Sequence, residues 1–306
     1  MSGGIEYAIG LAEERWPFLE FHIKSSAEAE SSCPFCGGKD RFVTFADEPR
    51  YWCRQCGESG FLENKDPHHK LTEAELTEIR LRRLERKQEE FEKRLTALER
   101  LQRSNAYERY HDAMDEEAYT WWASKGCEAW MVHDYKLGMC SRCPTDGEHR
   151  RSYTIPLFDQ GQEKLLNLRH RIGSAQIGDK YRPEMAGLGT CLAFPHHLID
   201  AERAIVLEGE IKSLVCGAHG LPTVGLFGKR GRFKPSWLEM FPAGAPIYIA
   251  LDPDATDSAD RLGHGLAKLG KEVYVAEFPA KPDDILVDGA TVDDWMGFIH
   301  LARRVH

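Results

Sequence analysis

Two short apolar runs in the second half of the chain each end at an acidic residue. Residues 204–207 and 247–251 are rich in strand-forming side chains and too short for helices, so they predict buried strands. Between them, residues 210–218 have the pattern of a helix, 222–226 that of a strand and 235–241 that of a short helix. Strands that alternate with helices predict an α/β fold, with a parallel sheet and crossover helices.

Acidic residues stand directly after both runs. Glu208 follows the first run, and Asp252 and Asp254 follow the second. Ligands of parallel sheets gather at the carboxyl ends of the strands, so we expect these three side chains to converge. Converging carboxylates repel one another unless a cation offsets the repulsion, and Mg²⁺ prefers oxygen ligands. The pattern therefore favours a magnesium or manganese site for phosphoryl or nucleotidyl transfer; the alternative is a set of solvated loop acids.

Two Cys-x-x-Cys pairs lie near the start of the chain. Cys33 and Cys36 form the first pair, and Cys53 and Cys56 form the second, with residues 37–52 between them. This spacing is typical of a zinc ribbon in which four thiolates bind one tetrahedral zinc ion. Because four protein ligands leave no open coordination position, we expect this zinc to be structural.

Basic and aromatic residues lie beside the cysteines. Residues 41–45 and 50–52 predict a pair of strands that carry several of them. Phosphate contacts combined with base stacking are the usual means of binding single-stranded nucleic acid, although some of the aromatic rings must form the core of the ribbon. An apolar stretch at residues 16–21 is expected to pack against the same module.

The acidic strand ends resemble the TOPRIM domain, which DnaG-type primases, topoisomerases and some nucleases share. Glu208 matches the glutamate after the first strand of that family, and Asp252 and Asp254 match its Asp-x-Asp pair. The primases carry a third acidic position after the next strand, and Asp283 or Asp284 stands there in this chain. The resemblance implies that these acids hold a catalytic Mg²⁺ or Mn²⁺ ion.

The chain also departs from the primase pattern. Lys212 ends a Glu-Ile-Lys sequence where primases often have Tyr-Met-Asp, and Pro253 stands where glycine is common. The ribbon is similar to the zinc module of primases, which reads template sequence. Bacterial DnaG proteins usually have one histidine among the four ligands, and Cys36 makes all four cysteines here, as in several phage primases.

The middle of the chain predicts a connector and a basic hairpin. Residues 71–103 are dense in alternating charge, begin with a capping box and predict a solvated helix. Residues 112–125 and 128–133 predict two short helices, and 152–158 with 163–171 predict a hairpin. Cys140 and Cys143 form a third Cys-x-x-Cys pair, but no fourth pair matches it. This favours an ordinary loop over a second metal site.

Primases carry a similar hairpin whose arginines, with a later Lys-Tyr, line the template and nucleotide groove. The loop at residues 228–232 is glycine-flanked and basic, and is equally well explained as a solvated loop. The candidate ligands of nucleic acid and nucleotide are Arg150, Arg151, Arg169, Arg171, Lys180, Arg182, Lys212, Lys229 and Arg230.

Composition limits the function classes. The 306 residues carry a formal net charge of −9, which argues against indiscriminate coating of DNA, yet residues 150–182 hold seven basic and three acidic side chains. No apolar run approaches the roughly 20 residues that span a bilayer, and no secretory signal is visible. The cysteines are placed as metal ligands, which favours a reducing cytoplasm, the bacterial host's if the gene is viral.

We therefore predict a zinc ribbon in residues 1–66, a helical connector in 67–104, an α+β subdomain in 105–200 and a TOPRIM domain in 201–306. The resemblance implies a DNA primase that uses a single-stranded DNA template, ribonucleoside triphosphates and a separate replicative helicase. A TOPRIM nuclease or topoisomerase, and a non-catalytic DNA-binding or helicase-recruiting protein, are the alternatives.

Overall fold

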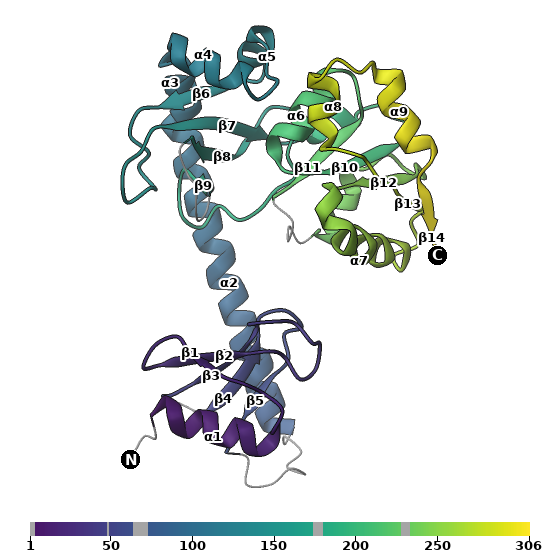
Figure 1. Ribbon diagram of the computed structural model, residues 1–306. Coiled ribbons are helices and arrows are strands. Elements are labelled where there is room, and N and C mark those ends of the chain that lie inside the picture. The colour runs from purple at the N-terminus through teal and green to yellow at the C-terminus, as the bar shows by residue number, and fades with distance from the viewer. Residues whose placement is uncertain (1–3, 48, 64–72, 174–179, 228–232) are drawn as a thin grey trace. The chain divides into compact units, whose positions relative to one another are not determined.

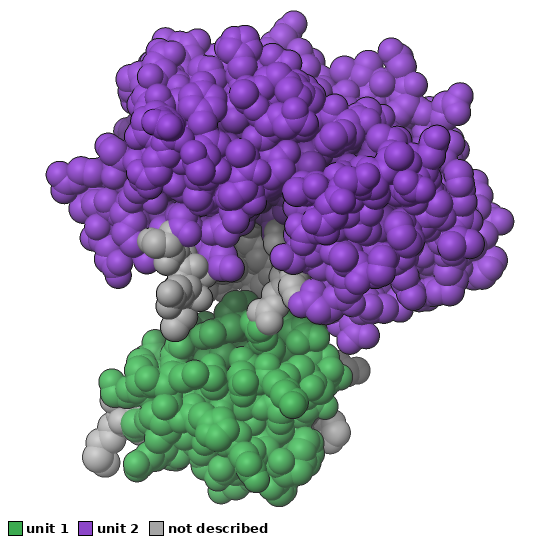
Figure 2. All heavy atoms as spheres, turned by 45° about the horizontal axis from the view of Figure 1, so that its top comes forward, with its two compact units in different colours: residues 1–83 green, residues 84–306 purple. Residues whose placement is uncertain are grey.

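The computed structural model describes residues 4–47, 49–63, 73–173, 180–227 and 233–306. The chain forms two compact units, residues 1–83 and residues 84–306, which have different colours in Figure 2. None of the helices in the described ranges combines the length and the apolar character needed to cross a membrane.

The first unit is built on an antiparallel sheet. Its five strands pair in chain order. They are β1 (His22–Ile23), β2 (Glu28–Ser31), β3 (Phe42–Phe45), β4 (Arg50–Cys53) and β5 (Ser59–Phe61). Helix α1 (Ile5–Arg15) precedes the sheet, and Trp16 follows it directly. The ring of Trp16 meets the rings of Phe42 and Tyr51 edge-on at 5.2 and 5.1 Å, so the apolar amino-terminal stretch packs on the ribbon as expected.

The charged connector is the long helix α2 (Glu73–Ser104). The residue expected to cap it, Thr72, lies outside the described residues. Leu84, Phe91 and Leu95 are exposed along it, as a solvated helix predicts. Its last turns differ, because Ala97 and Leu101 join a buried cluster with Leu165, Leu168 and Leu188 of the second unit.

The second unit begins with helices and a second antiparallel sheet. The helices are α3 (Ala106–Asp112), α4 (Glu116–Ala123) and α5 (Ala129–Asp134). The sheet has the order β6 (Gly138–Cys140), β7 (Ser152–Phe158), β8 (Leu165–Ile172) and β9 (Tyr181–Pro183). The long β7–β8 pair is the hairpin that the glycine turn and the alternating pattern predict.

A third sheet carries the acidic strand ends. Its order is β11 (Thr223–Leu226), β10 (Ala204–Glu208), β12 (Ile247–Ala250), β13 (Val273–Val275) and β14 (Arg303–Val305). The first four strands are parallel, and β14 runs antiparallel at the edge. This is the parallel-rich, TOPRIM-like α/β sheet that the sequence predicts.

Helices cover both faces of the third sheet (Figure 1). Helix α7 (Thr256–Ala267) packs on one face with Val206 and Ile249. Helices α6 (Glu210–Ala218), α8 (Pro282–Val287) and α9 (Val292–His300) pack on the other with Leu207. The described part of this unit also contains three short 3₁₀ helices: η1 (Pro195–Leu198), η2 (Pro235–Met240) and η3 (Pro253–Ala255). Because successive residues of β10 face opposite sides, the strand is buried on both, as parallel strands are.

Candidate active site

The four cysteines of the ribbon form a metal-binding cluster. Their sulfur atoms all lie within 4.8 Å of one another. The Sγ atoms of Cys33 and Cys56 are 3.8 Å apart, and those of Cys36 and Cys53 are 3.7 Å apart. A tetrahedron with zinc–sulfur bonds of about 2.3 Å has sulfur–sulfur edges of about 3.8 Å, whereas a disulfide bond is about 2.05 Å long. The geometry therefore fits one structural zinc ion.

The acidic residues lie at one edge of the third sheet. Leu207 and Ala250 are partners in the parallel pair β10–β12, so Glu208 and Asp252 stand at the ends of neighbouring strands. Gly209 turns the chain from β10 into α6, with φ 90° and ψ 164°. This backbone region is essentially restricted to glycine. The turn places Glu208 and Lys212 on either side of it at the same sheet edge.

A pocket of about 220 Å³ joins this edge to the basic hairpin. Glu208, Asp283 and Asp284 line it from the acidic side, and Arg171 and Tyr181 line it from the hairpin. Ser124, Lys125, Lys212 and Lys281 are also in its wall. Three of the predicted acids and one arginine of the predicted basic strip thus line one concave site.

The two aspartates of the Asp-x-Asp pair lie in different environments. Asp252 is nearly buried, and its Oδ1 lies 3.1 Å from Nζ of Lys212. Asp252 instead borders a separate, smaller cavity of about 100 Å³ with Pro253 and Glu277. Asp254 is exposed on η3 and lines neither cavity. Within the described ranges, the four cysteines are the one group of three or more potential metal ligands whose ligand atoms all lie within 4.8 Å of one another. The acidic side chains are therefore farther apart than the cysteines.

Asp283 shows that the acidic edge suits a cation. Its Oδ1 atom is buried without a hydrogen-bond partner. Burial raises the pKa of Asp283, the charge of Lys212 lowers it, and the charges of Asp284 and Asp252 raise it again. A buried carboxylate oxygen that lacks a donor and faces other carboxylates is stabilised by a bound cation. The donor set present here therefore fits Mg²⁺ or Mn²⁺.

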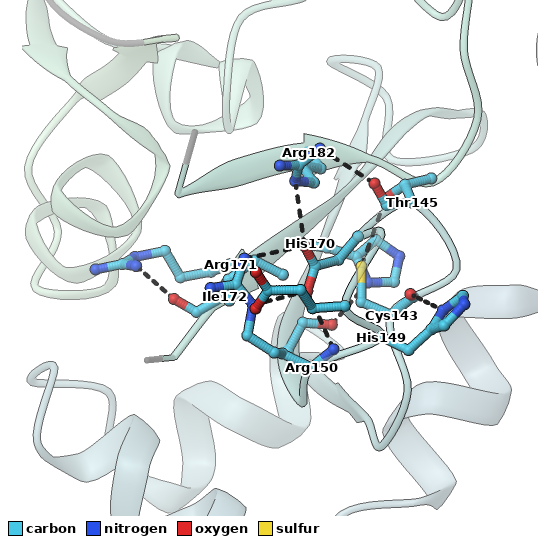
Figure 3. A network of polar contacts seen from close by, with 11 residues as sticks. Cys143, Thr145, His149, Arg150, His170, Arg171, Ile172 and Arg182 are labelled. Carbon is cyan, nitrogen blue, oxygen red and sulfur yellow. Dashed lines mark hydrogen bonds and ion pairs between the residues drawn. The ribbon is translucent and has the colours of Figure 1, made fainter. Parts of the chain in front are cut away.

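Several of the predicted basic residues have acidic partners within the protein. Arg150 forms an ion pair with Asp146, with Nε 2.8 Å from Oδ2, and holds the pKa of Asp146 well below its usual range. Arg182 donates to the carbonyl oxygen of Thr145 at 3.2 Å (Figure 3). Arg151 likewise contacts the carboxylates of α4 and its cap, Asp115 and Glu117.

The remaining basic candidates fall into three groups. Arg169 is buried against Glu210. Arg171 lies 5.2 Å from the ring of Tyr181 at the pocket, and Lys180 next to that tyrosine is exposed. Lys229 and Arg230 lie outside the described residues.

A buried polar network around His170 was not foreseen from the sequence. Nδ1 of His170 is 2.9 Å from the hydroxyl of Ser152, and Nε2 is 2.5 Å from Oε2 of Glu184. Burial lowers the pKa of His170, but contacts with Cys140, Cys143 and Glu184 raise it, to about 11. The pairing of β6, β7, β8 and β9 brings these residues together, and no local spacing in the sequence reveals that. Cys140 and Cys143 are both buried and contact His170.

No family model matches the chain, and no curated protein matches it. Among solved structures, the zinc-binding and RNA polymerase domains of the Aquifex aeolicus primase match all of this chain and 87% of that one, with 16% identity and a TM-score of 0.53. The RNA polymerase domain of Mycobacterium tuberculosis primase DnaG matches 66% of this chain and 82% of that one, with 14% identity and a TM-score of 0.52.

A DnaG primase catalytic domain bound to single-stranded DNA matches 71% of this chain and 83% of that one, with 12% identity and a TM-score of 0.50. Identities this low establish architecture rather than activity. The first of these matches covers the whole chain, from the four-cysteine ribbon to the parallel-rich sheet. The chain therefore has the fold of the zinc-binding and RNA polymerase domains of DnaG-type primases.

Proposed function

We propose that this protein is a DNA primase, which synthesises short RNA primers on a single-stranded DNA template from ribonucleoside triphosphates. The observation that carries the proposal is the pocket in which Glu208, Asp283 and Asp284 face Arg171 and Tyr181. A site of this kind offers carboxylates to a divalent ion and cations to phosphates within one cavity. The primase fold around it supports the choice of nucleotidyl transfer over other phosphate chemistry.

The reaction forms one phosphorus–oxygen bond and breaks another. The 3′-hydroxyl of the growing primer attacks the α-phosphorus of the incoming nucleotide, and pyrophosphate leaves. A bound Mg²⁺ or Mn²⁺ ion would stabilise the attacking and leaving oxygens. Glu208, Asp252 and Asp254, with Asp283 or Asp284, are the residues that would hold it.

Basic residues would hold template and triphosphate. Arg171 and Lys180 come first, because they lie at the pocket or are exposed beside Tyr181. The arginines that pair with carboxylates of the protein would have to leave those carboxylates to bind phosphate. Lys229 and Arg230 are candidates from the sequence alone. Contacts to phosphates position a nucleic acid and do not specify its sequence. A related catalytic domain has been solved with single-stranded DNA, which supports that substrate.

The ribbon would contact the template. Its zinc would be structural, since four thiolates close the coordination shell. Strand β4 turns Tyr51 and Cys53 inward and leaves Arg50 and Trp52 exposed, with Trp52 43% exposed. An exposed indole next to an arginine provides stacking and phosphate contact, the two interactions that bind single strands. The helicase that opens the duplex would be a separate cytoplasmic protein.

The test is incubation with single-stranded DNA, labelled ribonucleotides and Mg²⁺. Short RNA products that disappear in Asp252→Ala support the proposal. Shortened DNA would instead identify a TOPRIM nuclease, which uses the same acids. DNA binding without either product would identify a non-catalytic replication protein. Asp288→Ala is the matched control, because Asp288 is an exposed acid at the end of α8 and lines neither cavity.

A further inference from the structure

A lysine lies inside the proposed ion-binding site. Lys212 is on the first turn of α6, close after Glu208, and its side chain is 16% exposed. Its Nζ atom is 3.1 Å from Oδ1 of Asp252, whose side chain is 11% exposed. The lysine also lines the pocket beside Glu208 and Asp283. The first turn of α6 therefore brings a positive charge to the end of the neighbouring strand β12.

The charge of Lys212 acts on a second acid. Asp283 comes from α8, and its Oδ1 atom is buried without a hydrogen-bond partner. Lys212 and Asp283 line the same pocket, together with Asp284. One ammonium group thus compensates carboxylates that reach the site from two separate elements.

Enzymes that transfer phosphoryl groups commonly place two divalent ions about 3.5–4 Å apart, one near each reacting oxygen. Each ion needs carboxylate oxygens of its own, and a fixed ammonium within contact distance of those oxygens repels an ion that competes for them. A lysine at this point therefore changes how many ions the acids can hold, and it does so without chemistry of its own.

We propose that Lys212 is a positioning residue that acts as a built-in cation. Its Nζ atom forms an ion pair with Asp252 at 3.1 Å and it shares the pocket with Asp283, so that the acidic edge binds a single divalent ion. This inference rests on the proposed function, because it concerns the same acids. It goes further by assigning the number of ions and the residue that sets it.

The experiment counts Mn²⁺ ions bound to the full-length, zinc-loaded protein, by electron paramagnetic resonance without nucleotide or DNA. We expect one Mn²⁺ for the wild type, one for Lys212→Arg and two for Lys212→Asp. Lys281→Asp makes the same charge change in the same pocket, at a lysine with no ion pair to Asp252 among the described residues, and it should keep one. If Lys212→Asp does not fold, Lys212→Asn replaces it, and we expect two Mn²⁺ ions for that variant as well.

Two ions in the wild type, or a second ion in Lys281→Asp as well, would overturn the inference. So would an unchanged count in both Lys212→Asp and Lys212→Asn. Because the assay contains no nucleotide, its outcome is independent of primer synthesis. A protein that makes primers and binds two ions refutes the role of Lys212 alone, and one that shows the expected counts without primers refutes the primase proposal alone.

Discussion

Arg169 donates a hydrogen bond from Nε to Oε1 of Glu210 at 3.0 Å. The side chains are 13% and 2% exposed, so the pair is buried. It links β8 of the basic hairpin to the first turn of α6, two residues after Glu208. Burial raises the pKa of Glu210, and the charge of Arg169 lowers it. The pair therefore holds the two halves of the pocket against each other.

Replacing one member of this pair should be much worse than replacing both. Arg169→Met leaves a buried carboxylate without its cation, which costs about 3–5 kcal/mol of the free energy of unfolding. Arg169→Met with Glu210→Met removes both charges and should regain most of that loss. Urea unfolding of the two variants and the wild type measures the difference. Equal stability of the single and double variants would show that Glu210 costs nothing when its cation is missing.

The same pair shows where sequence reasoning stops. Alternation along the hairpin correctly predicts strands, but the expectation that Arg169 contacts phosphate rests on resemblance. Its partner Glu210 is 41 positions away in the chain, and no local pattern reports a contact across that distance. Helix α6 was predictable because its periodicity is local. The strand–helix alternation likewise predicts the parallel sheet, while the edge strand β14 and the helix α1 have no comparably strong signal.

The turn at Gly209 should be intolerant of a side chain. A Cβ atom at φ 90° strains the backbone by about 1–3 kcal/mol, although no atom lies within 4 Å to clash with it. Relief of that strain shifts Glu208 and Glu210, so Gly209→Ala should weaken Mn²⁺ binding by about tenfold or more. Isothermal titration with Mn²⁺ checks this.

Gly265→Ala is the control for that variant. Gly265 lies within α7 in open space, where alanine should stabilise the helix by about 0.5–1 kcal/mol and leave Mn²⁺ affinity unchanged. Wild-type affinity in Gly209→Ala would mean that the turn does not position the acids.

The zinc ribbon should depend on its metal, while the acidic site should not. Cys53→Ser removes one of four thiolates and should abolish zinc binding and unfold residues 33–57, because the binding free energy of the metal is folding free energy in such modules. Zinc content by mass spectrometry and hydrogen exchange of the ribbon give the result. Mn²⁺ binding at the acids should persist, and its loss together with the ribbon would contradict two separate modules.

The His170 network should make stability fall at alkaline pH. The pKa of His170 rises from 6.5 to about 11 on folding, so its stabilising effect is complete below about pH 6.5 and is lost as the pH approaches 11. Burial raises the pKa of Cys143, but contacts with His170 and Thr145 lower it from 9.0 to about 6, which offsets that loss up to pH 9. The net fall therefore lies between about pH 9 and 11.

His170→Asn tests this prediction. The variant should be less stable than the wild type at pH 8 and should lose less stability between about pH 9 and 11, as measured by urea unfolding at each pH. Identical slopes in the two proteins would show that the imidazole does not carry a proton in the folded state.

The pocket contains residues that were not among the candidate ligands. Ser124 and Lys125 follow α4 and enter the wall of the pocket beside Val287. Gly126, with φ 77°, allows this approach, since a Cβ there would lie 2.4 Å from a methyl group of Val287. The closeness of this Lys-Gly sequence to α8 depends on how the two sheets pack, and no local pattern reports that. The acids of the site, by contrast, were predictable from the sequence because they follow strands. The carboxyl ends of parallel strands meet at one edge of the sheet, so residues at those ends lie close together.

Sequencing of the RNA made on a mixture of defined single-stranded templates tests the central claim most directly. The protein, supplied with all four ribonucleotides and Mg²⁺, should yield short RNAs complementary to the templates, and Asp252→Ala should reduce their amount by at least about a hundredfold. RNA unrelated to the templates, or templates cut without any RNA being made, would contradict the proposal that these carboxylates join nucleotides on a DNA strand.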